Sequence, residues 1–91
     1  MADPLIGYVI TEHARLEMGR RGLSEEIVRQ VLTDPERRRE VRAGREVLQR
    51  RLAMGDPAKV YLIQVFADTD RSPAEVVTAY RTSRISRYWR D

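Results

Sequence analysis

His13 is the single histidine of this 91-residue chain, and histidine is the side chain that ordinarily exchanges a proton near neutral pH. On a helix, His13, Glu17 and Arg21 would follow one another at i, i+4 and i+8 and would share one face. Glu17 could then orient the imidazole and also pair with Arg21. This arrangement suits a general acid or base held by a carboxylate. The alternative is a boundary histidine that packs against the rest of the domain, and the spacing by itself favours that alternative.

Arginines recur every third residue near the C-terminus and alternate with hydroxyl and aromatic side chains. Guanidinium groups make bidentate contacts with phosphate, hydroxyls add neutral donors, and aromatic rings provide stacking surfaces. Because no long amphipathic helix accompanies them, the combination favours a nucleic-acid backbone over a membrane surface. Alternatively, the arginines form a solvated face and the aromatic residues fill the core, as we expect of Trp89. The segment contains Tyr80, Arg81, Thr82, Ser83, Arg84, Ser86, Arg87, Tyr88, Trp89 and Arg90.

Two further arginines, Arg50 and Arg51, lie in the middle of an expected strand, where their side chains point to opposite faces. Arg51 shares the polar face with Gln49 and is therefore the better candidate for reaching a substrate. Arg81 ends the last expected strand, where strand pairing would fix the position of its guanidinium. We therefore expect Arg81 to matter more than the arginines that follow it in the chain.

Composition limits the chemistry that these residues can perform. The chain has no cysteine, which excludes disulfides, thiolate zinc sites and cysteine nucleophiles, and one histidine is too few for a histidine-based metal site. A glycine-rich phosphate loop, a paired-carboxylate metal motif and a Gly-x-Ser-x-Gly elbow are all absent from the sequence. We therefore expect neither a metal nor another cofactor, and the sequence gives no support for nucleotide hydrolysis or serine-esterase chemistry.

Charge is divided unevenly along the chain. Residues 1–36 carry four arginines against seven acidic residues, a net charge of −3, whereas residues 37–91 carry thirteen basic against seven acidic residues, a net charge of +6. A basic half of this kind is a possible electrostatic footprint for nucleic acid. It would equally suit an interface with an acidic protein. A third interpretation is that the sixteen arginines, against a single lysine, reflect coding bias and are merely solvated.

The first part of the chain predicts a short extended stretch followed by two helices. Thr11 is a suitable N-cap for a helix over residues 12–21, and Gly22 supplies the left-handed conformation that ends many helices. Ser24 caps a second helix, which Asp34-Pro35 stops. The turn between the two helices is very short, so they should form a helical hairpin. The extended stretch covers residues 5–10.

After Pro35 the apolar pattern changes to the period of two that is typical of strands. Short turns between these strands indicate an antiparallel meander, and Thr82 is a plausible cap for a short C-terminal helix. With a length below that of a typical domain, the chain predicts a single α+β domain over residues 1–91. The helical hairpin should cover one face of a twisted antiparallel sheet of about four strands and leave the other face concave and open. The strands are expected at residues 39–42, 46–54, 59–67 and 75–81.

The longest apolar stretch, Val60–Ala67, is interrupted by Gln64 and is much shorter than the ~20 residues that a membrane helix needs. The start of the chain lacks the cationic and apolar segments of a signal peptide. We therefore expect a soluble, cytoplasmic protein without membrane association.

Two blocks of the sequence together resemble a family of small bacterial domains of unknown function. The first block is Ile10-Thr11-Glu12-His13-Ala14, continuing to Met18-Gly19-Arg20-Arg21-Gly22-Leu23-Ser24, and the second is residues 76–89, from Val-Val-Thr-Ala-Tyr-Arg to Arg-Tyr-Trp. That family is grouped with RelE/ParE-like and BrnT-like toxins, which are small basic domains with an αα hairpin on an antiparallel sheet. The resemblance therefore implies a RelE-like fold.

The resemblance also implies the toxin of a toxin–antitoxin pair that acts as a metal-independent endoribonuclease on its basic concave sheet. In that case His13 would be the general acid or base, Arg51 and Arg81 would hold the phosphate, and Ser83 or Tyr88 would position the 2′-hydroxyl. The possible partners are RNA, in particular mRNA, an antitoxin protein and a second copy of the chain. The further residues expected to contact RNA or to support catalysis are Tyr80, Ser83, Arg84, Arg87 and Tyr88.

The alternative is a binding module without catalysis, either a ParE-like inhibitor of a protein target or a degenerate relative of a toxin. Such a module would have no need for His13, whereas a nuclease of this design would depend on it.

Overall fold

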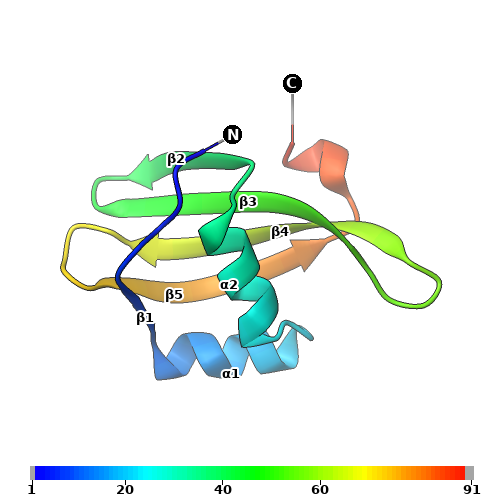
Figure 1. The fold of residues 1–91 in the computed structure, drawn as a ribbon, viewed down its shortest axis with the longest axis horizontal. Coiled ribbons are helices and arrows are strands. Elements are labelled where there is room, and N and C mark those ends of the chain that lie inside the picture. The colour runs from blue at the N-terminus through cyan, green and yellow to red at the C-terminus, as the bar shows by residue number, and fades with distance from the viewer. Residues whose placement is uncertain (1, 90–91) are drawn as a thin grey trace.

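Two helices cover one face of a five-stranded sheet in the computed structural model, which describes residues 2–89 (Figure 1). The strands lie in the order β1-β5-β4-β3-β2, so β4 is central. The expected α+β architecture, with a helical pair on a sheet, is confirmed. The elements are β1 Tyr8–Ile10, α1 Glu12–Arg20, α2 Glu25–Thr33, β2 Arg37–Arg42, β3 Arg45–Met54, β4 Lys59–Asp68 and β5 Ala74–Thr82.

Side-chain caps set where the helices begin. The Thr11 hydroxyl accepts a hydrogen bond from the Ala14 backbone N–H at 3.1 Å, and the Ser24 hydroxyl accepts one from the Ile27 N–H at 3.1 Å. Both caps were expected from the sequence, and each satisfies an N–H group that has no partner within the helix. Between the helices Gly22 has φ +67°, the left-handed conformation that allows the tight turn.

The sheet is mixed and has five strands, which corrects the expectation of an antiparallel sheet of about four. Strand β1 pairs in parallel with β5, Tyr8 opposite Ala74 and Ile10 opposite Val76, while the other neighbouring strands are antiparallel. The extended stretch at residues 5–10 thus supplies the additional strand. Its pairing partner lies more than sixty residues away, and local periodicity carries no information about such a partner.

The core lies between the helices and one face of the sheet. Leu48 is fully buried there, and Leu52 and Met54 pack against the same core, as their alternation along β3 predicted. Ile63 and Val65 of β4 complete the helix-facing side, so Gln64 and Phe66 lie on the opposite side. No helix within residues 2–89 is long and apolar enough to cross a membrane.

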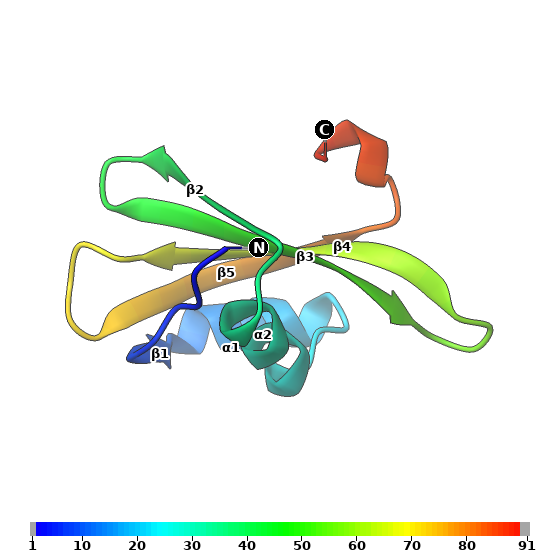
Figure 2. The ribbon, with the colours of Figure 1, turned by 45° about the horizontal axis from the view of Figure 1, so that its top comes forward.

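The expected short C-terminal helix is reduced to a single 3₁₀ turn at Ile85–Arg87. No side chain caps this turn, and the Thr82 hydroxyl instead accepts the Arg84 backbone N–H at 3.0 Å while Thr82 remains in β5. A segment this short gains too few hydrogen bonds to offset the cost of nucleating an α-helix. Figure 2 shows the turn on the side of the sheet opposite the two helices.

Candidate functional site

Two hollows adjoin on the face of the sheet opposite the helices. The larger has a volume of about 480 Å³ and the smaller about 240 Å³, and Phe66 and Tyr80 line both. The larger hollow is lined by Arg39, Gln64, Phe66, Tyr80, Arg81, Thr82 and Tyr88. The smaller hollow is lined by Val41, Arg42, Arg45, Phe66, Thr78 and Tyr80.

A hydrogen-bond network connects helix α1 to the rim of the smaller hollow. One carboxylate oxygen of Glu17, Oε1, accepts the Thr78 hydroxyl at 2.8 Å and lies 3.2 Å from His13 Nε2. The other oxygen, Oε2, accepts an N–H of Arg21 at 3.1 Å. The shared helix face of His13, Glu17 and Arg21 is therefore confirmed, and Thr78 is an addition that the sequence analysis missed.

Arg21 holds the aromatic wall of the site in place. Its guanidinium donates to the Thr78 hydroxyl at 2.9 Å and to the Ala79 carbonyl at 3.0 Å, and it lies 4.1 Å from the centre of the Tyr80 ring. Phe66 meets the same ring edge to face, with 5.8 Å between ring centroids. Tyr80 is thus fixed by two neighbours and still 41% exposed, which makes it a preorganised contact surface.

The electrostatics of the network favour the ionised form of Glu17. The hydrogen bond from Thr78, together with the positive charges of Arg21 and His13, lowers the pKa of Glu17. The Glu17 carboxylate is an acceptor and lies against the Nε2 side of the imidazole, so the Nδ1 side faces away from it. The His13 side chain is 73% exposed, and a substrate can reach it.

Two arginines of β2 line the hollows and make no hydrogen bond or ion pair with the described residues. Arg39 lines the larger hollow and Arg42 the smaller one, and both are exposed. The pKa of the Asp68 carboxyl is lowered by its hydrogen bond from Arg45 and also by the charge of Arg42, which is near enough to contribute. The sequence analysis did not select either residue, although the alternation along β2 carries the signal that Arg39 and Val41 share a face.

Arg51 lies on the open face as expected, but its guanidinium is already engaged. It donates to the two Glu36 carboxylate oxygens at 2.9 and 3.2 Å and lies 4.5 Å from the centre of the Trp89 ring. The hydrogen bond from Arg51 lowers the pKa of Glu36 to about 2. Trp89 is half-buried, and Arg37 stacks on it at 3.7 Å, so this cluster anchors the C-terminal segment to the sheet.

Arg81 borders the larger hollow, but its guanidinium lies on the helix side of the sheet. It sits 5.1 Å from the centre of the Tyr61 ring, and a Cβ placed on Gly22 would lie 3.4 Å from it. A register shift at Phe66/Ala67 leaves Val77 without a partner on β4, and this bulge reverses the alternation along β5. The structure therefore does not bring Arg51 and Arg81 together on one phosphate, since the two guanidinium groups lie on opposite faces.

The remaining predicted residues lie around the C-terminal end of β5. Tyr88 lines the larger hollow and is 48% exposed. Ser83, Arg84 and Arg87 are exposed and line neither hollow. Arg90 lies outside the described residues.

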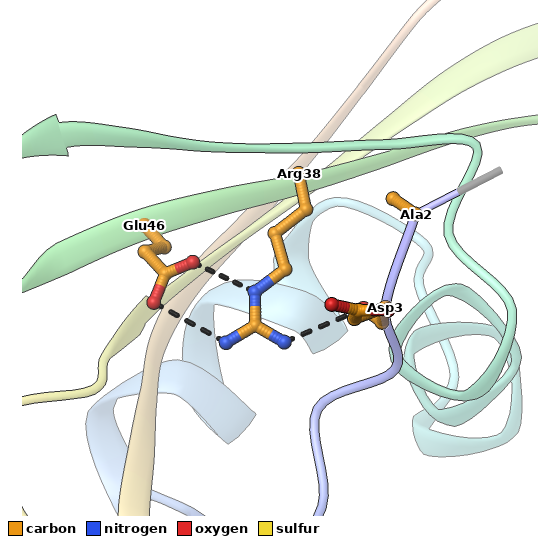
Figure 3. Close-up of a pocket in the computed structure, with 4 residues that line it drawn as sticks. All are labelled: Ala2, Asp3, Arg38 and Glu46. Atoms are coloured by element: carbon orange, nitrogen blue, oxygen red, sulfur yellow. Dashed lines mark hydrogen bonds and ion pairs between the residues drawn. The ribbon is translucent and has the colours of Figure 1, made fainter.

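A third hollow, of about 580 Å³, lies beside the N-terminal segment and is lined by Ala2, Asp3, Arg38 and Glu46 (Figure 3). Arg38 donates two hydrogen bonds to the Glu46 carboxylate, at 2.7 and 3.2 Å, and two to the Asp3 and Pro4 carbonyls, at 3.3 and 3.0 Å. Because these donors are used internally, Arg38 ties the N-terminal segment to the sheet rather than offering a ligand site.

Comparison with known proteins gives one match. The family model described as a domain of unknown function, DUF4258, matches residues 10–81. No curated protein and no solved structure matches the chain. The matched range includes the His13–Glu17–Thr78 network and Tyr80, whereas Tyr88 lies beyond it. In the described part of the chain, no group of three or more histidine, cysteine or acidic side chains is placed to hold a metal ion.

Proposed function

We propose that this chain, which belongs to the DUF4258 family, is a toxin-type endoribonuclease that cleaves RNA by side-chain acid–base chemistry, without a metal ion. The observation that carries the proposal is the His13–Glu17 pair, held against Thr78 at the rim of a hollow that Arg42 also lines, with no hydrogen bond or ion pair from Arg42 to residues 2–89. The resemblance to RelE/ParE-like and BrnT-like toxins supports the same conclusion. It also motivates the finer proposals of a RelE-like fold, an antitoxin partner and a cytoplasmic location.

In this mechanism the nucleophile belongs to the substrate. His13 Nδ1 takes the proton from a 2′-hydroxyl, the 2′ oxygen bonds to the adjacent phosphorus, and the bond from phosphorus to the 5′ oxygen breaks. The Tyr80 hydroxyl donates a proton to the departing 5′ oxygen and recovers one from protonated His13 through solvent. The products are a 2′,3′-cyclic phosphate and a 5′-hydroxyl. Proton transfer by a positioned side chain typically accelerates such a step about 10²–10⁴-fold.

The charge that develops on the phosphate needs a fixed cation. Arg42 lines the smaller hollow beside Thr78 and Tyr80, and its N–H groups donate no hydrogen bond to residues 2–89. Arg42 therefore takes the role of holding the phosphate, which the sequence analysis gave to Arg51 and Arg81. A preorganised donor at a reacting oxyanion contributes about 3–4 kcal/mol to the rate. Arg45, on the same rim, is bound to Asp68 at 2.7 Å and serves to hold the strand pair.

A non-catalytic binding module is the second candidate, and one observation favours it. The two arginines expected to hold the phosphate are on opposite faces, and Arg51 is occupied by Glu36. A basic open face of this kind could bind RNA, or an acidic protein target in the manner of a ParE-like inhibitor, without cleaving anything.

The two candidates are separated by a cleavage assay with a labelled single-stranded RNA in the presence of EDTA. We expect the wild-type protein to release a 2′,3′-cyclic phosphate, and His13→Asn to lose at least ~100-fold in rate with unchanged RNA binding. Gln30→Ala, on the exposed surface of α2, is the matched control and should cleave normally. A folded His13→Asn variant with full activity overturns the catalytic role, and RNA binding without cleavage by the wild type favours the binding module.

A further inference from the structure

Gln64 presents a hydrogen-bond donor to the larger hollow. Its side-chain oxygen accepts an N–H from Gln49 at 3.0 Å, and Gln49 is only 2% exposed, so the pair has a fixed orientation. Because the oxygen of the Gln64 amide faces Gln49, the NH₂ group faces away from it. That NH₂ group donates no hydrogen bond to any of residues 2–89, and Gln64 lines the hollow.

The second unpartnered polar group of this hollow is also a donor. Arg39 approaches from β2, on the far side of β3, and a guanidinium can donate but not accept. The Thr82 hydroxyl already accepts the Arg84 N–H at 3.0 Å, so its own hydrogen is available as a donor. The donors of Gln64, Arg39 and Thr82 therefore match a ligand that presents acceptors to them.

The walls of the hollow suit a flat aromatic ligand. Tyr80 and Tyr88 are 41% and 48% exposed, and Phe66 lies between the two hollows. Exposed aromatic side chains are the surfaces on which proteins stack unpaired bases of single-stranded RNA. The volume of about 480 Å³ lies within the range of small-molecule sites.

We infer that the larger hollow is a nucleobase subsite that selects guanine; the inference rests on the proposed function and defines its base specificity. The Hoogsteen edge of guanine carries two acceptors, N7 and O6, whereas adenine has a donor in place of O6 and cytosine presents an amino donor. Arg39 and Gln64 supply matching donors. Because Phe66 and Tyr80 line both hollows, the phosphate of a guanosine bound here would lie toward the smaller hollow, which Arg42 lines and where Thr78 contacts the Glu17 carboxylate.

The inference is tested by fluorescence anisotropy with short oligocytidylates that contain one guanosine, inosine, adenosine or 2-aminopurine. A 2′-fluoro group on each nucleotide prevents cleavage, so binding is measured by itself. Inosine keeps O6 and N7, whereas 2-aminopurine lacks O6. We expect guanosine and inosine to bind about tenfold or more tightly than adenosine and 2-aminopurine, as a bidentate base contact provides.

A charge-matched pair of variants assigns the preference to Gln64. Gln64→Glu keeps an acceptor for Gln49 but replaces the donor to the base with an acceptor, so it should abolish the preference for guanosine over adenosine. Gln30→Glu adds the same charge on α2, away from the hollow, and should weaken binding equally for all four oligonucleotides. Thermal unfolding establishes that each variant is folded.

The possible results separate the inference from the proposed function. Equal binding of guanosine and adenosine oligonucleotides, or a preference that survives in folded Gln64→Glu, overturns the guanine subsite and leaves RNA cleavage standing. Guanosine-selective binding without cleavage overturns the nuclease and leaves the subsite. Absence of binding by every oligonucleotide overturns both. If Gln64→Glu fails to fold, the comparison of inosine with 2-aminopurine on the wild type still decides the inference.

Discussion

Arg38 and Arg39 are neighbours on β2, and the alternation of side chains along a strand sends them to opposite faces of the sheet. Arg38 ties the N-terminal segment to Glu46, whereas Arg39 lines the larger hollow without a partner among residues 2–89. Replacing each by methionine, which keeps much of the apolar stem, should therefore produce opposite results. Arg38→Met should lower the free energy of unfolding and leave RNA binding unchanged. Arg39→Met should leave the free energy of unfolding unchanged and weaken RNA binding.

The size of the Arg38 effect follows from its contacts. The guanidinium donates two hydrogen bonds to the Glu46 carboxylate and two to backbone carbonyls, with both charged side chains about one-fifth exposed. Hydrogen bonds to charged groups contribute ~1.5–3 kcal/mol each when well protected, and partial solvation reduces this. Glu46 keeps its bond from the Thr69 hydroxyl at 2.7 Å, so it is not left unpaired. We expect a loss of about 2–3 kcal/mol, or roughly 10–20 °C in Tm for a domain of this size.

The assay combines thermal unfolding followed by circular dichroism with RNA anisotropy at low salt. Arg39→Met should change the free energy of unfolding by no more than ~0.5 kcal/mol, because its side chain is exposed and unpaired. Its affinity for RNA should fall several-fold, and the salt dependence of binding should become shallower. Equal Tm values for the two variants would refute the structural role of Arg38, and unchanged RNA affinity in Arg39→Met would remove Arg39 from the binding surface.

Three further predictions concern single contacts. Glu17→Gln should reduce single-turnover cleavage by ~10–100-fold without weakening RNA binding, because the uncharged amide no longer fixes the His13 ring; an unchanged rate would make Glu17 purely structural. Arg51 lowers the pKa of Glu36 from 4.5 to about 2, so this pair contributes stability above pH 4.5 that is lost as the pH falls towards 2. In urea unfolding at pH 6 and pH 3, Glu36→Gln should therefore show a smaller acid-induced loss of stability than the wild type, and an equal loss would contradict the assignment. Gly44→Ala should lower the free energy of unfolding, measured in urea, by at least about 1–2 kcal/mol, because Gly44 has φ +81° and a Cβ there would lie 2.5 Å from an Asp70 carboxylate oxygen. A variant as stable as the wild type would show that the turn relaxes.

The part of the site that could be predicted from the sequence depends on helical geometry, which is local. His13, Glu17 and Arg21 share a face because residues four apart on a helix are always neighbours. Thr78 completes the same network from β5, across a separation of 61 residues from Glu17. Only the packing of α1 along the edge of the sheet brings these residues together, and no local pattern contains that information.

The strands show the same division between local and long-range information. Alternation correctly placed Leu48 in the core and Gln49 and Arg51 on the opposite face. It failed at Arg81, because the bulge at Val77 reverses the side-chain direction for the rest of β5. A bulge arises from the pairing with β4, so a count of alternating residues from Val76 places Arg81 on the wrong face.

The candidate site is located better by asking which arginines are bound to carboxylates than by the net charge of the basic half. In the basic half, Arg38, Arg45 and Arg51 are bound to carboxylates, and their charge is neutralised within the fold. Arg39 and Arg42 lie on the same strand as Arg38 yet keep their donors for the hollows. Added salt should therefore weaken RNA binding more than it lowers folding stability. Binding depends on exposed guanidinium groups without ion-pair partners, whereas folding depends on short and partly buried ion pairs. If RNA affinity falls with salt while Tm changes little, the two groups of arginines have separate roles; a parallel fall in both would mean that binding and folding draw on the same charges.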